Sequence, residues 1–212
     1  MIKKYRSLIL VTSLVTVLPI LIGLLFWNRL PAMMATHFGV SGEANGYSGK
    51  AVAVFFIPLF VLAMHLICVC ATLLDPKKKE ISDKMLYLVF WICPVTSWFC
   101  AILVYSNALG MNLDVMTAVD IFMAVLFIGI GNYLPKCRQN YTVGIKLPWT
   151  LDDPENWNKT HRLGGRLFVL AGLVCLVDIF LRIFWLPLAA ICLASLIPCI
   201  YSVVLYQRKK KE

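Results

Sequence analysis

Charged residues are scarce in this sequence. Only 15% of its 212 residues are Asp, Glu, Lys or Arg, whereas 60% are hydrophobic, and the mean hydropathy is +0.81. A soluble domain carries about a quarter of its residues as charged side chains. Several apolar runs of about 20 residues are present, and each is long enough to cross a hydrocarbon core of about 30 Å. These features exclude an ordinary soluble domain and predict an all-α, polytopic membrane protein.

Other absences narrow the class further. The chain lacks the alternating segments of about ten residues that build a membrane β-barrel. None of its eight cysteines forms a CxxC pair, and all except Cys137 lie in apolar runs. We therefore interpret them as packing residues and expect no metal site, no disulfide framework and no cofactor. No A-x-A cleavage site follows the first apolar run, 7–27, which we interpret as a retained helix and not as a signal peptide.

The apolar runs predict six transmembrane helices. We place them at about 7–27, 51–74, 85–106, 115–134, 167–184 and 187–206. The chain then has three regions. Residues 1–134 hold four helices and an outer loop at 28–50, whose glycines indicate a series of turns. Residues 135–166 form a cytoplasmic signature loop and an interfacial helix, and 167–212 hold two helices and a basic tail.

The signature loop contains a strong helix start at Asp153, Pro154 and Glu155. An Asp at the N-cap, a Pro at the first helical position and an acid in the first turn are each favourable there. We expect this helix to lie near the membrane surface. It then either runs or turns into the fifth span near Gly164 and Gly165.

The distribution of lysine and arginine predicts the orientation. If the N-terminus is cytoplasmic, all but three of the 20 basic residues fall on the cytoplasmic side. The exceptions are Arg29, Lys50 and Arg182. Both termini and the 135–166 loop are therefore predicted to be cytoplasmic. The net charge of +9 is then a topology signal, so we expect no direct binding of nucleic acid.

Three charged residues and one histidine lie within the predicted spans. Asp178 and Arg182 are four residues apart, and we expect them to pair because an unpaired charge at mid-membrane costs roughly 2.5–3.5 kcal/mol. Asp120, in the first two turns of the fourth span, complements the positive end of that helix. We interpret His65 as a hydrogen-bonded packing residue, with a proton relay as the alternative.

The stretch 131–165 reads GNYLPKCRQNYTVGIKLPWTLDDPENWNKTHRLGG and resembles the signature of the SdpI family of bacterial membrane proteins. The matching residues are Gly131, Asn132, Leu134, Pro135, Lys136, Asn140, Gly144, Ile145, Lys146, Pro148, Trp149, Thr150, Trp157, Thr160, His161 and Arg162. Lys146 stands where family members often carry Arg. The outer loop is similar to the short domain that often precedes this signature. Its matching residues are Leu30, Pro31, His37, Phe38, Gly42 and Lys50.

The resemblance implies a non-enzymatic immunity and signalling protein of the bacterial cell membrane. Proteins of this family protect the cell from a secreted peptide toxin of the cannibalism type. The founding system also holds a cytoplasmic repressor at the membrane, where it is kept from acting. The expected partners are therefore membrane lipids, a peptide toxin and a cytoplasmic repressor.

The residues of the loop also predict a shared polar network. Its proposed members are Asn132, Asn140, Lys146, Trp149, Thr150, Trp157, Thr160, His161 and Arg162. Because their side chains are rich in hydrogen-bond donors, we expect the side chains of Asn132 and Asn140 to accept from Arg162 and to donate to neutral His161. The alternative is an interfacial loop, anchored by Trp149 and Trp157, whose basic residues face lipid phosphates.

Two further function classes stay open. Asp178, Arg182 and His65 could line a transport path. Six spans without an evident internal repeat argue against a transporter, because many transporter folds are built from such repeats. In a membrane-embedded hydrolase, His161 could be a general base and Arg162 could stabilise an anion. That reading is weakened because the sequence lacks a nucleophile elbow, an HExxH motif and paired intramembrane aspartates.

Overall fold

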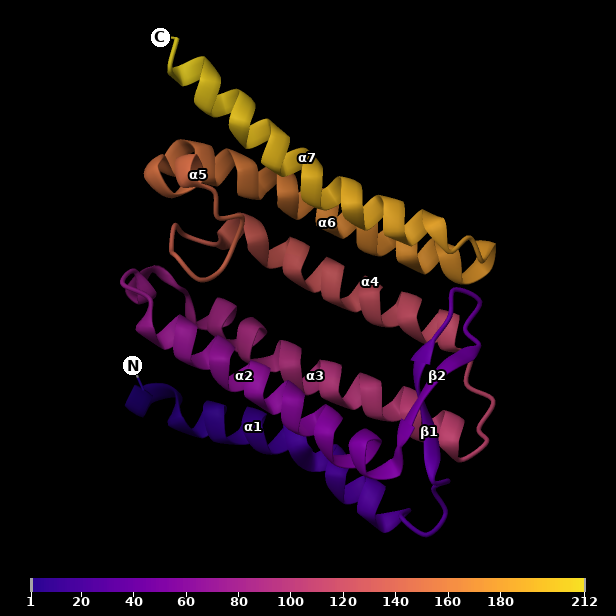
Figure 1. The fold of residues 1–212 in the computed structure, drawn as a ribbon. Coiled ribbons are helices and arrows are strands. Elements are labelled where there is room, and N and C mark those ends of the chain that lie inside the picture. The colour runs from indigo at the N-terminus through magenta and orange to yellow at the C-terminus, as the bar shows by residue number, and fades with distance from the viewer. Residues whose placement is uncertain (1, 212) are drawn as a thin grey trace. The chain divides into compact units, whose positions relative to one another are not determined.

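The structure is a computed structural model that describes the backbone of residues 2–211 and the side chains of residues 4–211. Within this part of the chain, six helices are long and apolar enough to cross a membrane. They are α1 (Ile2–Leu25), α2 (Ile57–Leu74), α3 (Asp83–Ala108), α4 (Val115–Tyr133), α6 (Pro154–Leu181) and α7 (Trp185–Lys209) (Figure 1). The predicted all-α, polytopic membrane fold with six spans is confirmed.

Shorter elements connect these helices. They are strands β1 (Met33–Phe38) and β2 (Ala44–Gly49), a π-helical turn (Val52–Phe56), two 3-10 turns (Lys78–Glu80 and Leu134–Lys136) and helix α5 (Pro148–Asp152). Contacts divide the described chain into two compact units. One comprises residues 2–73 and 89–119, and the other comprises residues 74–88 and 120–211.

In the first unit, a proline in α1 leaves a backbone carbonyl of α1 available for a hydrogen bond from α3. Pro19 has no amide hydrogen, so it cannot bond the carbonyl of Val15 four residues earlier. That carbonyl instead accepts a hydrogen bond from Trp98 Nε1 at 3.0 Å. One turn away, Tyr105 Oη donates to the carbonyl of Pro19 at 3.1 Å. The proline thus frees the Val15 carbonyl for Trp98, and side chains of α3 bind the α1 backbone at both positions.

The outer loop is an antiparallel β-hairpin and not the series of turns that its glycines suggested (Figure 1). Met33 pairs with Gly49 at one end and Phe38 with Ala44 at the other, with irregular register around His37. Gly42 lies in the connecting turn at φ 84°, a left-handed conformation that glycine adopts without strain. The alternation in 33–38 and 44–49 is weak because small residues interrupt it, so the sequence by itself favours turns there.

A small core fixes the base of the hairpin. The buried side chain of Met34 belongs to a hydrophobic cluster that includes Val54 and Tyr105. Lys50 closes the hairpin from the other side, because its Nζ donates to the carbonyls of Trp27 and Leu30 at 2.9 and 3.0 Å. The same ammonium lies 4.7 Å from the centroid of the Trp27 ring. Lys50 is therefore a structural anchor.

In the second unit, α6 runs without a break through Gly164 and Gly165, so the interfacial helix and the fifth span are one element. Asp153 is its N-cap, as predicted, and accepts from the amide of Glu155 at 2.9 Å. Glycines also bring α6 close to α4. A Cβ added at Gly131 would lie 2.7 Å from the carbonyl oxygen of Gly165, so only a residue without a side chain fits.

Candidate functional site

The fully buried side chain of Asn140 organises the connection between α4 and α6. Its Oδ1 accepts from the amides of Thr142 and Val143 at 2.9 and 2.7 Å. Its Nδ2 donates to the carbonyls of Arg138 and Val143 at 2.8 and 3.1 Å. Asparagine commonly bonds its own backbone in this way at turns. Here one side chain replaces part of the secondary structure that residues 138–143 lack, because it satisfies four of their backbone polar groups.

Trp157 and His161, one turn apart on α6, pack against this loop and bind its backbone. Trp157 Nε1 donates to the carbonyl of Cys137 at 2.7 Å, and the Trp157 and His161 rings stack with centroids 4.0 Å apart. The amide of Ile145 donates to His161 Nε2 at 2.9 Å. His161 Nδ1 lies 2.8 Å from the Trp157 carbonyl. An Nε2 that accepts an amide hydrogen carries no proton, so the ring is neutral and Nδ1 is the donor.

Gly144 lets the loop pass directly over these two rings. Its φ of 120° is a conformation that side-chain-bearing residues rarely adopt. A Cβ added there would also collide with His161 Nε2 and would lie 3.0 Å from Trp157 Cη2. The loop, the tryptophan and the histidine thus form one packed unit, which we call the junction and define as residues 137–162 together with Asp75 and Lys77.

Asp75, at the C-terminal end of α2, binds the junction from a distant part of the sequence. Its Oδ2 accepts from the Tyr141 amide at 2.9 Å and from Thr142 Oγ1 at 2.6 Å. Its Oδ1 accepts from the Lys77 amide at 2.7 Å. Lys77 in turn donates through Nζ to Gln139 Oε1 at 2.8 Å. These bonds compensate for burial of the carboxylate.

A second set of bonds joins the junction to α7. Ser202 Oγ accepts from Trp149 Nε1 at 2.8 Å, and the Ser202 carbonyl accepts from Asn156 Nδ2 at 2.9 Å. Thr160 Oγ1 donates to Asn156 Oδ1 at 3.0 Å, which fixes the orientation of that amide. One residue of α7 thus binds both α5 and α6.

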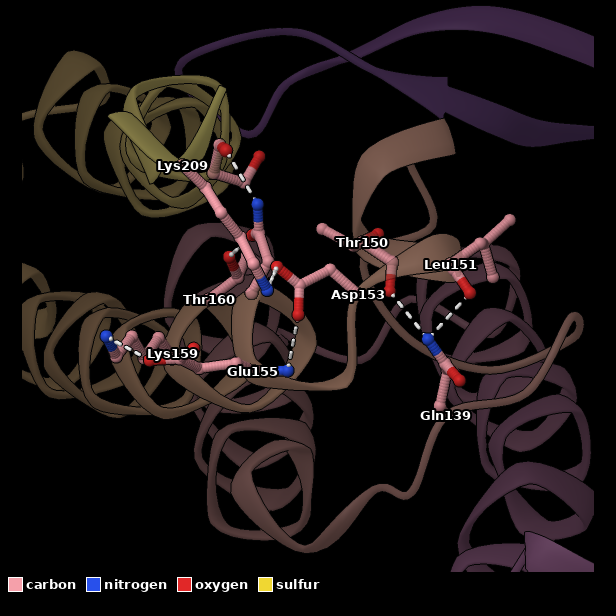
Figure 2. Close-up of polar contacts among 10 residues, drawn as sticks. Gln139, Thr150, Leu151, Asp153, Glu155, Lys159, Thr160 and Lys209 are labelled. Atoms are coloured by element: carbon pink, nitrogen blue, oxygen red, sulfur yellow. Dashed lines mark hydrogen bonds and ion pairs between the residues drawn. The ribbon is translucent and has the colours of Figure 1, made fainter. Parts of the chain in front are cut away.

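Helix α5 is held at both ends by side chains. Thr150 Oγ1 accepts from the Leu147 amide and donates to the Ile145 carbonyl, both at 2.9 Å. Figure 2 shows Gln139 Nε2 reaching the carbonyls of Thr150 and Leu151, at 3.0 and 2.6 Å. This single-turn helix therefore depends on side-chain bonds and not on its own length.

Burial and hydrogen bonding shift two pKa values in the junction. Burial raises the pKa of the Cys137 thiol from 9.0 to about 11, although a bond from Asn140 acts in the opposite direction. For Asp153, partial burial opposes ionisation. Hydrogen bonds from Lys209 and from the amides of Glu155 and Asn156 outweigh that effect and lower its pKa. Cys137 is thus a protonated packing group, whereas Asp153 is an ionised helix cap.

Three predicted members of the network lie outside the buried part of the junction. Asn132 Nδ2 donates to the Ile128 carbonyl at 3.0 Å within α4, and Lys146 Nζ donates to the Thr142 carbonyl at 2.8 Å. Arg162, the residue after His161 on α6, is exposed. For Asn140, the predicted acceptance from Arg162 and donation to His161 are wrong, because backbone groups occupy its amide. The two halves of the loop instead meet where the Ile145 amide donates to His161.

The predicted intramembrane charges and the predicted hairpin residues lie outside the junction. Asp178 Oδ1 accepts from the Ile183 amide at 2.9 Å and closes the end of α6, where Arg182 is the C-cap at φ 56°. Asp120 is buried near the start of α4. In the hairpin, His37 is exposed and its Nδ1 lies 2.6 Å from Asn45 Oδ1, while Phe38 is half-buried.

The main residues that sequence analysis missed are Asp75, Cys137, Gln139 and Ser202. Each reaches the junction through backbone groups or from another helix, so no local motif includes it. For Asp75 the signal was an acid followed directly by a proline at a helix end, a pattern favourable for a turn.

Comparison with known proteins finds matches for two segments of the chain. The SdpI/YfhL protein family matches residues 136–202, and a domain of unknown function, DUF1648, matches residues 14–62. The immunity protein SdpI of Bacillus subtilis (strain 168) is 24% identical over 207 residues, which cover 95% of this chain and 96% of that protein. The chain is therefore similar to the SdpI family over its signature loop and last two helices. No solved structure matches it.

The SdpI-family match covers most of the junction and the part of α7 that binds it, and the second match covers the hairpin. With its six apolar helices, the chain is a multi-pass protein of the cell membrane. The relative is named as an immunity protein. In the junction of this chain, both ring nitrogens of His161 are engaged by backbone groups. No lone pair on that ring is left to act as a general base.

Proposed function

We propose that this protein is an integral-membrane immunity protein that protects a bacterium from a secreted peptide toxin. The observation that carries the proposal is the similarity to the Bacillus subtilis immunity protein along nearly the whole of both chains. A likeness confined to the membrane spans would be weak support, since apolar helices resemble one another. Here the matched segments include the polar hairpin and the junction.

The hairpin is the part that we propose faces the toxin. In the predicted orientation it is the largest segment outside the cell. His37, Asn45 and Tyr47 are exposed on its strands, whereas Met34 is buried beneath them. Gly42 and Lys50 fit a supporting role, because one permits the turn and the other binds backbone carbonyls at the base. The exposed side chains can therefore be changed without removing what holds the hairpin.

Toxin challenge of sensitive cells that express Tyr47→Ala or His37→Ala tests this assignment. We expect each variant to reach normal membrane abundance and to lower protection severalfold, since each removes an exposed side chain and no core contact. Asn112→Ala is the matched control, because Asn112 is exposed in another predicted outer connection, that between α3 and α4. Full protection by both hairpin variants would show that the toxin is met elsewhere. A wild-type protein that never protects would overturn the immunity function itself.

We propose that the exposed surface of the junction carries a second, signalling role, in which it holds a cytoplasmic repressor at the membrane. The ordered loop supports this role, since a partner protein needs a fixed surface. Arg162 lies on the exposed side of α6, while the buried side binds Ile145 through His161. An exposed guanidinium suits an acidic partner surface.

The two roles can be separated with Arg162→Ala in a reporter strain that carries the candidate repressor. We expect this variant to protect normally but to release the reporter less than the wild type does. Lys79→Ala is the control, because Lys79 is also exposed and basic but lies outside the junction. Lys77 is unsuitable as a control, since its ammonium binds Gln139. Equal reporter release by Arg162→Ala and the wild type would contradict the signalling role.

A further inference from the structure

A groove between α6 and α7 combines an apolar wall with a basic end. It has a volume of about 500 Å³, within the range of about 300–1,000 Å³ usual for ligand pockets. Its apolar wall includes Leu163, Ile197, Ile200 and Val204, and its basic residues are Lys159 and Arg208. The lining residues of α7 recur every three or four positions, so they form one continuous helix face.

Both basic residues lie at the same end of this groove. Lys159 is near the start of α6 and Arg208 near the end of α7, and the two helices are antiparallel neighbours (Figure 1). From Ile197 to Arg208 the α7 face extends about 16 Å at a rise of 1.5 Å per residue. That length leads from the interior of the span to its end. The groove thus offers apolar surface at membrane depth and positive charge where lipid headgroups lie.

Of the two basic residues in the groove, Lys159 is in an ion pair within the protein and Arg208 can bind a ligand. Lys159 Nζ is 2.7 Å from Glu155 Oε1, and the neighbouring Lys209 Nζ is 3.0 Å from Asp153 Oδ2 (Figure 2). Arg208 has no ion pair among the described residues, although it lines both this groove and the adjoining polar pocket of about 280 Å³. Asp153 and Glu155 line that second pocket, and their carboxylates are occupied by the two lysines.

We propose that this groove binds one anionic phospholipid of the cytoplasmic leaflet. The Arg208 guanidinium donates to the lipid phosphate, Lys159 adds positive charge, and an acyl chain lies along Ile197, Ile200 and Val204. Basic pockets between transmembrane helices on the cytoplasmic side suit anionic headgroups. A free anion would leave the apolar wall unused, and a neutral lipid would leave Arg208 unused. Because Asn156 and Trp149 bind α7 at Ser202, the lipid would contact helices that also support the junction.

Native mass spectrometry of the full chain, released from nanodiscs of equal phosphatidylglycerol and phosphatidylcholine, tests this proposal. The wild type is expected to retain one phosphatidylglycerol in preference to phosphatidylcholine. Arg208→Gln should lower that preference about fivefold, since a basic residue near the membrane surface contributes about 1 kcal/mol. Lys210→Gln removes the same charge two residues further along and should change it little, because Lys210 does not line the groove.

A second pair of variants tests the acyl-chain part without changing charge. Val204→Trp should fill the groove and reduce retention, whereas Leu196→Trp, on an exposed part of α7 outside the groove, should not. Inorganic phosphate, added as a separate probe, should not displace the lipid. The proposal is overturned if Arg208→Gln and Lys210→Gln reduce retention equally, or if Val204→Trp has no effect. Displacement by inorganic phosphate would also overturn it and would indicate a site for free anions.

Discussion

At the residue scale, Asn140 and Cys137 show how one buried amide shields a thiol. Asn140 Nδ2 lies 3.4 Å from Cys137 Sγ, and both side chains are buried. The thiolate is the form that reacts with alkylating reagents. A rise in the pKa of Cys137 from 9.0 to about 11 lowers its thiolate fraction at neutral pH about a hundredfold. Cys137 is therefore both inaccessible and chemically quiet in the folded junction.

We accordingly predict that iodoacetamide labels Cys137 slowly in the native protein and that Asn140→Ala increases the labelling rate more than tenfold. The alanine removes the four bonds that hold residues 138–143, so the turn opens and the thiol approaches its ordinary pKa. Peptide mass spectrometry of protein in detergent would measure this rate. Lys146→Ala, which removes only one exposed bond, serves as the control. Equal labelling in the wild type and Asn140→Ala would mean that the amide does not hold the turn.

At the scale of single elements, Asp178 has a structural role at the end of α6. Its carboxylate accepts from the Ile183 amide just beyond the helix, where Arg182 adopts a left-handed conformation. Its other oxygen, Oδ2, is buried and has no hydrogen-bond partner among the described residues. A buried charge with one oxygen unbonded needs nearby positive charge to offset its desolvation. Arg182, the next basic residue along the chain, remains our predicted partner.

Detergent melting of single and double variants tests this pairing. Asp178→Asn keeps an oxygen for the Ile183 amide but removes the charge, so its loss of stability reports the pairing and not the cap. We expect Asp178→Asn and Arg182→Gln each to lower the melting temperature. The double variant should be less damaged than the sum of both, by about 0.5–3 kcal/mol of coupling. Strict additivity would show that Asp178 and Arg182 do not interact.

The elements also show how far the sequence predicts this fold. Long apolar runs determine the six helices, and the Asp153 cap determines where α6 begins, so both were predictable from local pattern. The hairpin was not, because its pairing depends on the core under Met34 and on Lys50 reaching back to Trp27. In the junction, residue types identified Asn140, Trp157 and His161 as buried polar groups. Their partners are backbone groups that become neighbours only on folding.

At the scale of the whole molecule, the distribution of basic residues predicts which side of the membrane each segment faces. Asn158 lies near the start of α6 and is exposed, between the buried Trp157 and the exposed Lys159. If the basic segments are cytoplasmic, this position faces the inside of the cell. An Asn158→Cys variant should then react with a membrane-impermeant maleimide only after the cells are permeabilised. Cys137 can stay in place, because it is buried.

A cysteine in the hairpin supplies the opposite result in the same experiment. Ser41 is exposed in the turn between β1 and β2, so Ser41→Cys should react in intact cells. Together the two variants determine on which side the hairpin and the junction lie, and the proposed division between toxin contact and signalling requires opposite sides. Labelling of Asn158→Cys in intact cells would invert the topology. The hairpin would then be inside the cell, where it could not meet a secreted toxin.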